Sequence, residues 1–359
     1  MNKKAIIAMS GGVDSSVAAY LMKQRGYECV GVTMKLFQGE DVEVSDAHSC
    51  CSLDDVKDAE SVAKQLGMPY HVFGFSDLFR ETVIDKFVEA YENGCTPNPC
   101  INCNRFLKFN KLYHRALELG CDYVVTGHYA RIECDKNSGR YILKKGLDPT
   151  KDQSYVLYSL SQEQLAHTIF PLGELNKTDA RAIAREQGFV SAHKHDSQDL
   201  CFVKDGDYAQ FIETYTGKTF PRGSFIDTEG NILGEHKGII HYTVGQRKGL
   251  GIAFGEPMFV CGINPKDNTV TLGKNSDLYT DTLTAGDINL ISVPSIDAPI
   301  RVKAKVRYRQ VEQWATVTQL DEETIRVKFD EPQRAITKGQ AVVLYDGDTV
   351  VGGGTIIEV

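Results

Sequence analysis

The stretch KAIIAMSGGVDSSVAAYLMKQRG (residues 4–26) decides the fold class. KAIIAM (4–9) is a short, continuous apolar run of the kind that a strand buried on both faces shows. A glycine turn follows, and SSVAAYLMKQRG (15–26) has the apolar spacing of a helix and ends in glycine. A strand that turns through glycines into a helix predicts the opening unit of a parallel α/β sheet.

The alternation of strand and helix continues to about residue 127. ECVGVTMKLF, MPYHVFGF and CDYVVTG read as strands, while LDDVKDAESVAKQLG, SDLFRETVIDKFVEAYENG and KFNKLYHRALELG read as helices. The helix SDLFRETVIDKFVEAYENG (76–94) is expected to be capped by Ser76 and to end at Gly94. This pattern predicts an α/β domain with a doubly wound parallel sheet.

The second half of the chain changes character. Residues 150–200 read as mostly helical, including NKTDARAIAREQG, and short strand-like runs with many glycines follow. From about residue 280, apolar and polar residues alternate between turn residues, which predicts a small antiparallel barrel. We therefore expect three domains: an α/β domain at 1–205, a mostly-β domain at 206–280 and a C-terminal β-barrel at 281–359.

Composition excludes several protein classes. Of the 359 residues, 42% are hydrophobic, and no apolar run approaches the roughly 18 residues of a membrane span. The short apolar run at the N-terminus argues against a signal peptide, so no membrane and a cytoplasmic location are expected. The ten cysteines are then expected to be reduced, with Cys29 and Cys261 as small buried hydrophobes. Because the net charge is −8, a nucleic-acid partner would have to be bound by local basic patches.

The glycine turn has the chemistry of an anion site. Gly11 and Gly12 permit close approach of the backbone, so successive amide groups can surround an anion at the start of a helix. Ser10, Ser15 and Ser16 add hydroxyl groups, and Asp14 could orient a metal or an amide. The turn is neither a Walker loop nor GxGxxG.

A single CxxC lies in TPNPCINCNR (96–105), which reads as a proline-punctuated loop. Zinc normally takes four ligands, and no second CxxC is present. A redox pair would open a helix directly after a strand, and this context is missing here; a nucleophile with a neighbour is the third reading. Elsewhere, Cys201 follows His193, Lys194 and His195, whose charges could lower the pKa of a thiol. Cys50 and Cys51, in a polar loop, have no assigned role.

Seven motifs in order carry a resemblance to a known family. They are AMSGGVDSS, TPNPCINCN, TGHYAR, KDQSYVLYSL, DSQDLCF, HYTVGQRKGLG and RYRQ. The first resembles the SGGxDS signature of the PP-loop ATP pyrophosphatases. Together the motifs resemble the bacterial tRNA-specific 2-thiouridylases, from residue 8 to the final GGGTIIEV, over essentially the whole chain.

The resemblance implies a reaction and two catalytic thiols. ATP, with Mg²⁺, would adenylate O2 of the wobble uridine in tRNA, and sulfur from a persulfide would then replace AMP. Cys201 would carry the persulfide, and Cys103 would be the second catalytic thiol. The persulfide either attacks directly, with Cys103 resolving the bond, or Cys103 first liberates hydrosulfide, and both routes end in a Cys103–Cys201 disulfide.

The resemblance also implies binding residues and partners. The ATP contacts would be Ala8, Met9, Ser10, Gly11, Gly12, Val13, Asp14, Ser15, Met34 and Gly127. Asn98, Pro99 and Cys100 would line the target base, and the tRNA contacts would be His128, Lys151, Asp152, Gln153, Arg307, Tyr308 and Gln340. The binding partners would be a tRNA with an unmodified wobble uridine and, as sulfur donor, a persulfide-bearing sulfur carrier protein or a cysteine desulfurase.

One position departs from the family pattern. The family usually has aspartate where this chain has Cys100. Either Cys100 replaces a proton-handling group, or Cys100, Cys103 and Cys201 form a three-thiolate site for an iron-sulfur cluster with one open iron. Related sulfur-transfer enzymes of the superfamily use such a cluster.

The barrel sequence offers one basic patch. In IRVKAKVRYRQ (300–310) the cations Arg301, Lys303, Lys305, Arg307 and Arg309 fall at every second position, which on a strand places them on one face. A single-sign row suits phosphates, although a solvated outer face is the plainer reading. GQRKGLG (245–251) is either a mobile strap or an ordinary loop.

Two rival functions remain at this stage. A PP-loop ligase acting on a small molecule would explain the glycine turn but would leave the cysteines and the basic strand without a role. A non-catalytic RNA-binding protein would not need both the intact loop and the two thiols.

Overall fold

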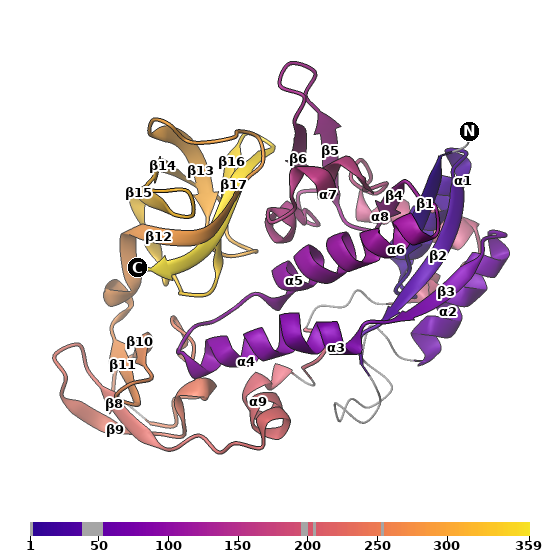
Figure 1. Cartoon of the computed structure of the whole chain (residues 1–359). Helices are drawn as coiled ribbons and strands as arrows, with labels where there is room; N and C mark the ends of the chain where they lie inside the picture. Colours follow the sequence, from indigo (N-terminus) through magenta and orange to yellow (C-terminus); the bar gives the residue numbers. More distant parts are fainter. Residues whose placement is uncertain (1–2, 38–52, 195–199, 204–205, 253–254) are drawn as a thin grey trace. The chain divides into compact units, whose positions relative to one another are not determined.

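The protein was analysed as a computed structural model that describes residues 3–37, 53–194, 200–203, 206–252 and 255–359. The chain divides into two compact units (Figure 1). The first comprises Met1–Val83, Cys100–Gly206 and Asp348–Val350, and the second comprises Ile84–Pro99, Asp207–Gly347 and Val351–Val359. The division of the chain at residues 205 and 280 stays a prediction.

A five-stranded parallel sheet is the centre of the first unit, which confirms the predicted fold class. Its strand order is β3-β2-β1-β4-β7, and each neighbouring pair is parallel. The strands are β1 (Lys4–Ala8), β2 (Glu28–Lys35), β3 (Tyr70–Gly74), β4 (Tyr123–Val125) and β7 (Thr168–Ile169). The two-residue β7 lies in the segment that was expected to be mostly helical.

Helices of the first unit pack on this sheet around an apolar core. Ile7, Val17, Met22 and Val62 are among its fully buried members. The α-helices are α1 (Val13–Gln24), α2 (Leu53–Gln65), α3 (Ser76–Phe79), α5 (Pro99–Asn102), α6 (Leu112–Glu118), α7 (Gln162–Ala166) and α8 (Lys177–Glu186). Short 3₁₀ turns span Ser154–Leu157 and Val190–His193, and β5 (Ala130–Cys134) pairs with β6 (Tyr141–Lys145) as a hairpin.

The predicted long helix over 76–94 is helical, with two corrections. A π-helical segment (Arg80–Ile84) separates α3 from α4 (Asp85–Glu92), and Phe75, not Ser76, is the N-cap residue. Gly94 follows the helix with φ +68°, as a terminating glycine requires.

The second unit contains a small mixed sheet and a closed barrel. The sheet has the order β10-β11-β8-β9, and the barrel has the order β12-β15-β14-β13-β16-β17, closed by pairing of β12 with β17. The elements of the sheet region are α9 (Tyr208–Thr216), β8 (Gly223–Ile226), β9 (Ile232–His236), β10 (Phe259–Asn264) and β11 (Thr269–Gly273). Two short 3₁₀ turns, Ile239–His241 and Asn275–Leu278, lie between and after them. The barrel strands are β12 (Tyr279–Leu290), β13 (Ile300–Lys305), β14 (Gln313–Gln319), β15 (Ile325–Arg334), β16 (Ala341–Asp346) and β17 (Thr349–Glu358).

The barrel confirms the predicted C-terminal architecture. Alternate residues of its strands, such as Val302, Val317, Val327 and Leu344, fill one buried core. Among the helices that the structure describes, none is both long and apolar enough to cross a membrane.

Candidate active site

The glycine turn joins the carboxyl end of β1 to the first turn of α1. Gly12 is the N-cap residue, and Gly11 has φ +71°, a conformation that favours glycine. Ser15 Oγ accepts a hydrogen bond from the Ser10 amide at 3.2 Å and donates to the Gly12 carbonyl at 3.1 Å. The turn is therefore held in shape by its own residues, with the first amides of α1 left for an anion.

The expected nucleotide residues gather at one edge of the sheet. Ser10 follows β1, Met34 lies near the end of β2, and Gly127 follows β4, and these three strands are neighbours in the sheet. A Cβ atom at Gly127 would lie 2.8–3.0 Å from atoms of Asp14, so the segment after β4 packs directly on the first turn of α1. Topology thus brings together the predicted segments 8–15, Met34 and Gly127.

Asp14 has a different environment from the one expected. Lys177 Nζ donates to both carboxylate oxygens at 2.7 Å, and Tyr129 Oη donates to Oδ1 at 2.8 Å. Lys177 is the first residue of α8, and its side chain is only 10% exposed. The Asp14 carboxylate is therefore held by a buried ammonium group in this structure, and its expected role toward a metal or an amide stays a prediction.

Lys177 was missed by sequence reasoning. It lies 163 residues from Asp14 along the chain, and nothing in NKTDARAIAREQG sets it apart from other helix-capping sequences. A lysine at a helix start is also unfavourable to the helix dipole, which would have been the one available signal.

Cys100 and Cys103 lie on a helix and not in a loop. Pro99 is the first residue of α5, where its fixed φ suits a helix, and a π-helical segment (Cys103–Lys111) follows α5 directly. Cys100 is exposed, whereas Cys103 is buried. The proline read as a loop residue is therefore a helix-starting residue, which is the physical reason for the correction.

Asn104, beside Cys103, is almost fully buried and anchors this helix. Its Nδ2 donates to the Val156 carbonyl at 2.9 Å. Among the described residues its Oδ1 has no hydrogen-bond partner.

Cys201 is half-buried, and its neighbour Phe202 fixes it to the first unit. The Phe202 ring is fully buried and packs edge-on against Phe79, with 5.9 Å between the ring centroids. Lys194 was expected to lower the pKa of this thiol, but its Nζ binds Asp55 and Asp58 at 2.6 Å each. Two carboxylates balance that charge, and an effect of Lys194 on the pKa of the Cys201 thiol stays a prediction.

The other cysteine predictions have mixed outcomes. Cys29 is buried, and burial raises the pKa of its thiol to about 11, which fits a small hydrophobe. Cys261 is half-buried, and burial also raises its pKa. His195, Cys50 and Cys51 lie outside the described residues.

The three-thiolate site is not assembled in this structure. Within the described part of the chain, which includes Cys100, Cys103 and Cys201, no group of three or more His, Cys, Asp or Glu side chains could hold a metal ion. These residues as placed do not fit a cluster, so no step of the reaction is derived through one.

The segment expected to hold tRNA is tied together by its own polar groups. Asp152 accepts hydrogen bonds from the amides of Gly146 and Ser154 and from the Ser154 hydroxyl. Gln153 Oε1 accepts from the Tyr129 amide at 3.0 Å, and Lys151 is half-buried. Asp152 and Gln153 therefore position backbone around the hairpin β5–β6.

His128 is buried between aromatic rings. Phe109 and Phe170 each lie 5.8 Å from its ring, and Thr126 Oγ1 lies 2.6 Å from Nδ1. Burial, with a smaller contribution from Lys108, holds the pKa of His128 well below 6.5. The imidazole is therefore neutral near pH 7.

The barrel residues divide into anchors and exposed groups. Arg307 donates to the carbonyls of Val244 and Ala335 and to the Thr337 hydroxyl. Gln340 Nε2 donates to the Thr96 carbonyl at 2.8 Å and the Pro97 carbonyl at 3.4 Å, directly before Asn98 and Pro99. Tyr308, in contrast, is 38% exposed.

The predicted row of five cations is wrong beyond Lys303. Strand β13 ends at Lys305, whose side chain is buried with its Nζ 5.6 Å from the Tyr345 ring, and a turn carries residues 307–310. Arg301 pairs with Asp330, so even the start of the row is mixed in sign. The segment 245–251 lies between elements as a loop with three left-handed glycines.

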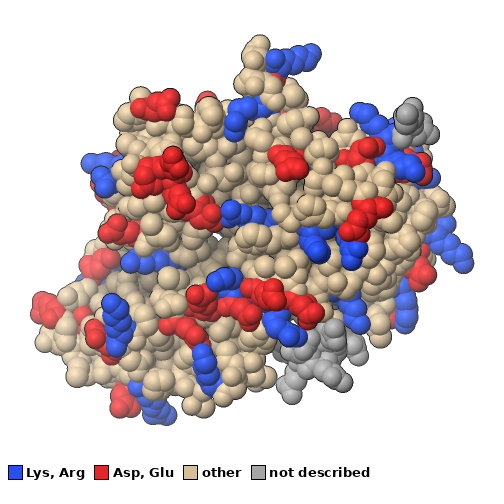
Figure 2. Space-filling view, viewed as in Figure 1, with Lys and Arg blue, Asp and Glu red and all other residues tan. Residues whose placement is uncertain are grey.

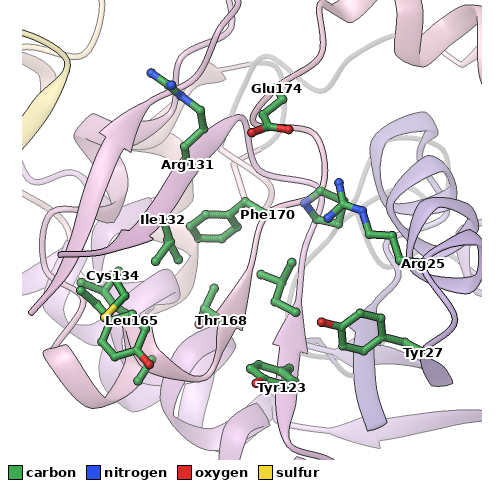
Figure 3. A pocket seen from close by; sticks show the side chains of 14 residues that line it. Arg25, Tyr27, Tyr123, Arg131, Ile132, Cys134, Leu165, Thr168, Phe170 and Glu174 are labelled. Carbon is green, nitrogen blue, oxygen red and sulfur yellow. The ribbon is translucent and has the colours of Figure 1, made fainter. Parts of the chain in front are cut away.

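Cavities do not identify the site. An open hollow of about 330 Å³ is lined by Arg25, Tyr27, Arg131, Phe170 and Glu174, among others (Figure 3). None of the predicted nucleotide or thiol residues lines it. On the face in Figure 2, acidic and basic side chains are interspersed, as expected for an acidic protein without a dominant field.

Comparisons with known proteins cover the whole chain. Family models described as tRNA methyl transferase HUP domain, tRNA methyl transferase PRC-barrel domain and Aminomethyltransferase beta-barrel domain match residues 3–205, 209–274 and 280–356. The tRNA-specific 2-thiouridylase MnmA of Clostridioides difficile is 56% identical over 356 residues, which are 99% of this chain and 98% of that protein. The enzyme of the same name from Acetivibrio thermocellus is 53% identical, with 99% of each chain covered.

One matching solved structure shows a distant likeness. A 4-thiouridine synthetase in complex with RNA and ATP matches with a TM-score of 0.36 and 19% identity, over 60% of this chain and 50% of that one. This likeness is too low to bear on function.

Proposed function

The chain belongs to the tRNA-specific 2-thiouridylases, which are tRNA sulfurtransferases, and from this premise we propose that it performs ATP-dependent 2-thiolation of the wobble uridine of tRNA. The observation that carries the proposal is that one compact unit holds both the glycine turn at the carboxyl edge of the sheet and the thiols of Cys103 and Cys201. Activation by a nucleotide and attack by sulfur both need groups of these kinds.

The glycine turn would bind the pyrophosphate part of ATP. The segment Ala8–Ser15 offers backbone amides and the Ser10 hydroxyl, while Met34 and Gly127 flank it from β2 and from the end of β4. Mg²⁺ bound with ATP would neutralise phosphate charge. Beside the same turn, Lys177 balances the charge of the Asp14 carboxylate, which would otherwise repel a phosphate.

Adenylation makes uridine O2 a leaving group. O2 attacks the α-phosphorus of ATP, a P–O bond to the β-phosphate breaks, and pyrophosphate leaves. The C2 atom then carries an O-linked AMP, which departs far more readily than an oxide would.

Sulfur would arrive as a persulfide on Cys201. In the direct route the terminal sulfur attacks C2 and displaces AMP, and the Cys103 thiolate then attacks Cys201 Sγ and releases thiouridine. In the second route Cys103 first attacks Cys201 Sγ and releases hydrosulfide, which displaces AMP. In both routes the two cysteines supply the two electrons that reduce the sulfane sulfur, and both end as a disulfide that an external dithiol must reduce.

Cys103 suits the role of the protected thiol. It is buried on the helix that Asn104 anchors, whereas Cys100, one turn earlier, is exposed. Burial protects a thiol from oxidants in solution until it reacts with Cys201. In this scheme Cys100, with Asn98 and Pro99, lines the base and handles protons.

The tRNA would be held by residues of both units. His128, Lys151, Asp152 and Gln153 lie in the first unit and Arg307, Tyr308 and Gln340 in the second. The contacts above suggest that Asp152, Gln153, Arg307 and Gln340 act mainly by positioning backbone. Tyr308, which is exposed, is the group best suited to touch RNA directly.

One assay tests the proposal. Metal-stripped protein is incubated with ATP, Mg²⁺, unmodified tRNA and a persulfide donor, and nucleosides are analysed by mass spectrometry. We expect 2-thiouridine together with pyrophosphate that forms only when tRNA is present. Activity that returns only after anaerobic addition of iron and sulfide would replace the persulfide mechanism by a cluster, and no thiolation under either condition would refute the proposed function.

A further inference from the structure

Four neighbouring barrel strands share an outward face of unusual composition. In β12, β15, β14 and β13, the residues Leu283, Val327, Val317 and Val302 are buried in the barrel core. Because side chains alternate along a strand, the residues between them face outward. The outward set is Thr282, Thr284, Arg301, Lys303, Trp314, Thr316, Thr318, Arg326, Lys328 and Asp330.

Strand register makes this set continuous. Arg301 lies opposite Thr316, which lies opposite Lys328, which lies opposite Thr282. The next row runs from Thr318 through Arg326 to Thr284, and Lys303 lies opposite Trp314. The outward set is therefore one surface across the strands labelled β12–β15 in Figure 1, which we call the Trp314 face.

The charge of the Trp314 face is opposite to that of the protein. It carries four cations and one anion in a chain whose net charge is −8, and two flanking carboxylates, Asp281 and Glu358, accept hydrogen bonds from its threonines. Arg301 is neutralised by Asp330, which accepts two hydrogen bonds of 2.7 Å from it. Within the described part of the chain, no carboxylate forms an ion pair with Lys303, Arg326 or Lys328. Glu358 lies opposite Thr284 and ends the row that contains Arg326.

Trp314 supplies an aromatic surface among these cations. It is the only tryptophan of the chain and is 51% exposed. The Arg301 guanidinium lies 5.6 Å and the Lys303 ammonium 5.5 Å from its ring. A base can stack on such a ring while its phosphates reach the flanking cations.

We propose that the Trp314 face binds RNA, with an unpaired base stacked on Trp314 and the phosphates on Lys303, Arg326 and Lys328. The proposal rests on the proposed function, since tRNA is the RNA in question, but it assigns a surface distinct from Arg307, Tyr308 and Gln340. The Thr316 and Thr318 hydroxyls can donate to phosphate or 2′-hydroxyl oxygens, whereas those of Thr282 and Thr284 donate to Asp281 and Glu358. Apart from Trp314 the outward set has no large apolar side chain, which a protein interface of comparable size would need at its centre.

The sole tryptophan makes the test direct. Unmodified tRNA is titrated into the full chain at low salt, and tryptophan emission is followed beside an independent binding measurement. Because no other residue contributes tryptophan emission, we expect a saturable change whose midpoint equals the dissociation constant. Trp314→Ala should weaken binding by about 5- to 100-fold, the range for one stacked base, and Trp314→Phe should weaken it less.

A matched pair of double variants tests the phosphate contacts. Arg326→Ala with Lys328→Ala should lower the slope of log K against log salt by about 1.4 to 1.8. Lys136→Ala with Lys266→Ala removes the same charge from exposed positions off this face and should leave the slope nearly unchanged. Equal slopes in the two double variants would show that only the total charge of the protein matters, and would contradict phosphate binding by the Trp314 face.

The failures are distinguishable. Suppose that the protein binds and thiolates tRNA, but tRNA leaves the tryptophan emission of the wild type unchanged and the variants keep its affinity and salt slope. This inference is then wrong, and the proposed function stands. If polyglutamate changes the emission and tRNA does not, the face binds an acidic protein instead. Absence of both tRNA binding and thiolation would overturn both proposals. Unchanged urea midpoints for the variants confirm that they are folded.

Discussion

The glycine turn (8–16) and the basic strand (301–309) are stretches of equal length that sequence reasoning treated alike, and they behave differently. In the turn, Ser10, Gly12, Ser15 and Ser16 bind one another within six residues of chain. These local bonds shape the turn, and long-range bonds add to them, since Ser16 Oγ lies 3.0 Å from Ser191 Oγ and Asp14 binds Tyr129 and Lys177. The predicted roles of its glycines and serines toward an anion stay a prediction, and in this structure the Ser15 and Ser16 hydroxyls donate to the Gly12 carbonyl.

In the basic strand each cation is defined by a distant partner. Arg301 binds Asp330, Lys303 lies over Trp314, Lys305 is buried beside Tyr345, and Arg307 binds carbonyls including that of Ala335. The same repeated charge thus yields an ion pair, a half-buried group over an aromatic ring, a buried group and an anchor. Alternation predicts which way a side chain points but not what it meets.

The largest expected effect tests whether the turn is as rigid as its local bonds suggest. In Gly11→Ala the new Cβ would lie 2.3 Å from the Asp55 carbonyl oxygen, a backbone atom, at φ +71°. Strain and overlap together should lower the free energy of unfolding by about 2 to 4 kcal/mol and abolish thiolation. Gly26→Ala is the matched control, because its φ is +79° with no atom within 4 Å; it should cost about 1 to 2 kcal/mol in urea melts. Equal losses in the two variants would contradict the packing of Asp55 on the turn.

The next effect concerns the ion pair of Asp14 with Lys177, which is one of several long-range contacts of the turn. Lys177→Met leaves the Asp14 carboxylate without its buried cation, so the free energy of unfolding should fall by about 1 to 3 kcal/mol. Because Asp14 is partly exposed, this loss is smaller than for a fully buried pair. Asp14→Asn combined with Lys177→Met should recover part of that loss. A double variant no more stable than the single one would show that the two residues are not energetically coupled.

A smaller effect separates anchors from exposed cations in the basic strand. Arg307→Ala removes three hydrogen bonds to second-unit acceptors and should cost about 1 to 2 kcal/mol of stability. Arg309→Ala, at an exposed turn position, should change stability by less than about 0.5 kcal/mol. Thermal and urea unfolding measure both; if Arg309 proves the more costly, the division into anchor and exposed group fails.

The smallest expected effect is a pH dependence of stability that comes from His128, which lies next to Gly127 and is buried by contacts distant in sequence. His128 has a folded pKa well below 6.5 because burial, aided by Lys108, disfavours its charge. Below pH 6.5 the unfolded chain therefore binds a proton that the folded protein does not, and stability falls with falling pH.

Between pH 7 and 5.5 this histidine should account for about 1 kcal/mol of the fall. His128→Asn removes the titrating group while keeping a polar atom near Thr126, so the difference between variant and wild type should shrink over that range. A parallel pH dependence of the two proteins would contradict a neutral, buried His128.

Much of the fold follows from the sequence because its signals are local. The parallel sheet and the barrel follow from apolar runs, alternation and terminating glycines, such as Gly94 after α4. Pro99 was misread because a proline starts a helix as readily as it punctuates a loop. The two-residue β7 escaped because its strand character comes only from pairing with β4.

For the candidate site, the sequence predicts only the residues that belong to a motif. The glycine turn and the two thiols could be named from their patterns and the family resemblance. Lys177, the pairing of Lys194 with Asp55 and Asp58, and the anchoring of Thr96 and Pro97 by Gln340 depend on residues far apart in the chain. A single sequence has no signal for such contacts.

The central claim is that Cys201 delivers sulfur and Cys103 completes the transfer. The most direct measurement is a single turnover by protein that carries one persulfide per chain and no external thiol, with tRNA, ATP and Mg²⁺, followed by mass spectrometry of both nucleosides and peptides. The account predicts one Cys103–Cys201 disulfide for each 2-thiouridine formed, and neither product in Cys103→Ser beyond a trapped intermediate. Thiouridine formed without that disulfide, or formed equally well by Cys103→Ser, would contradict it.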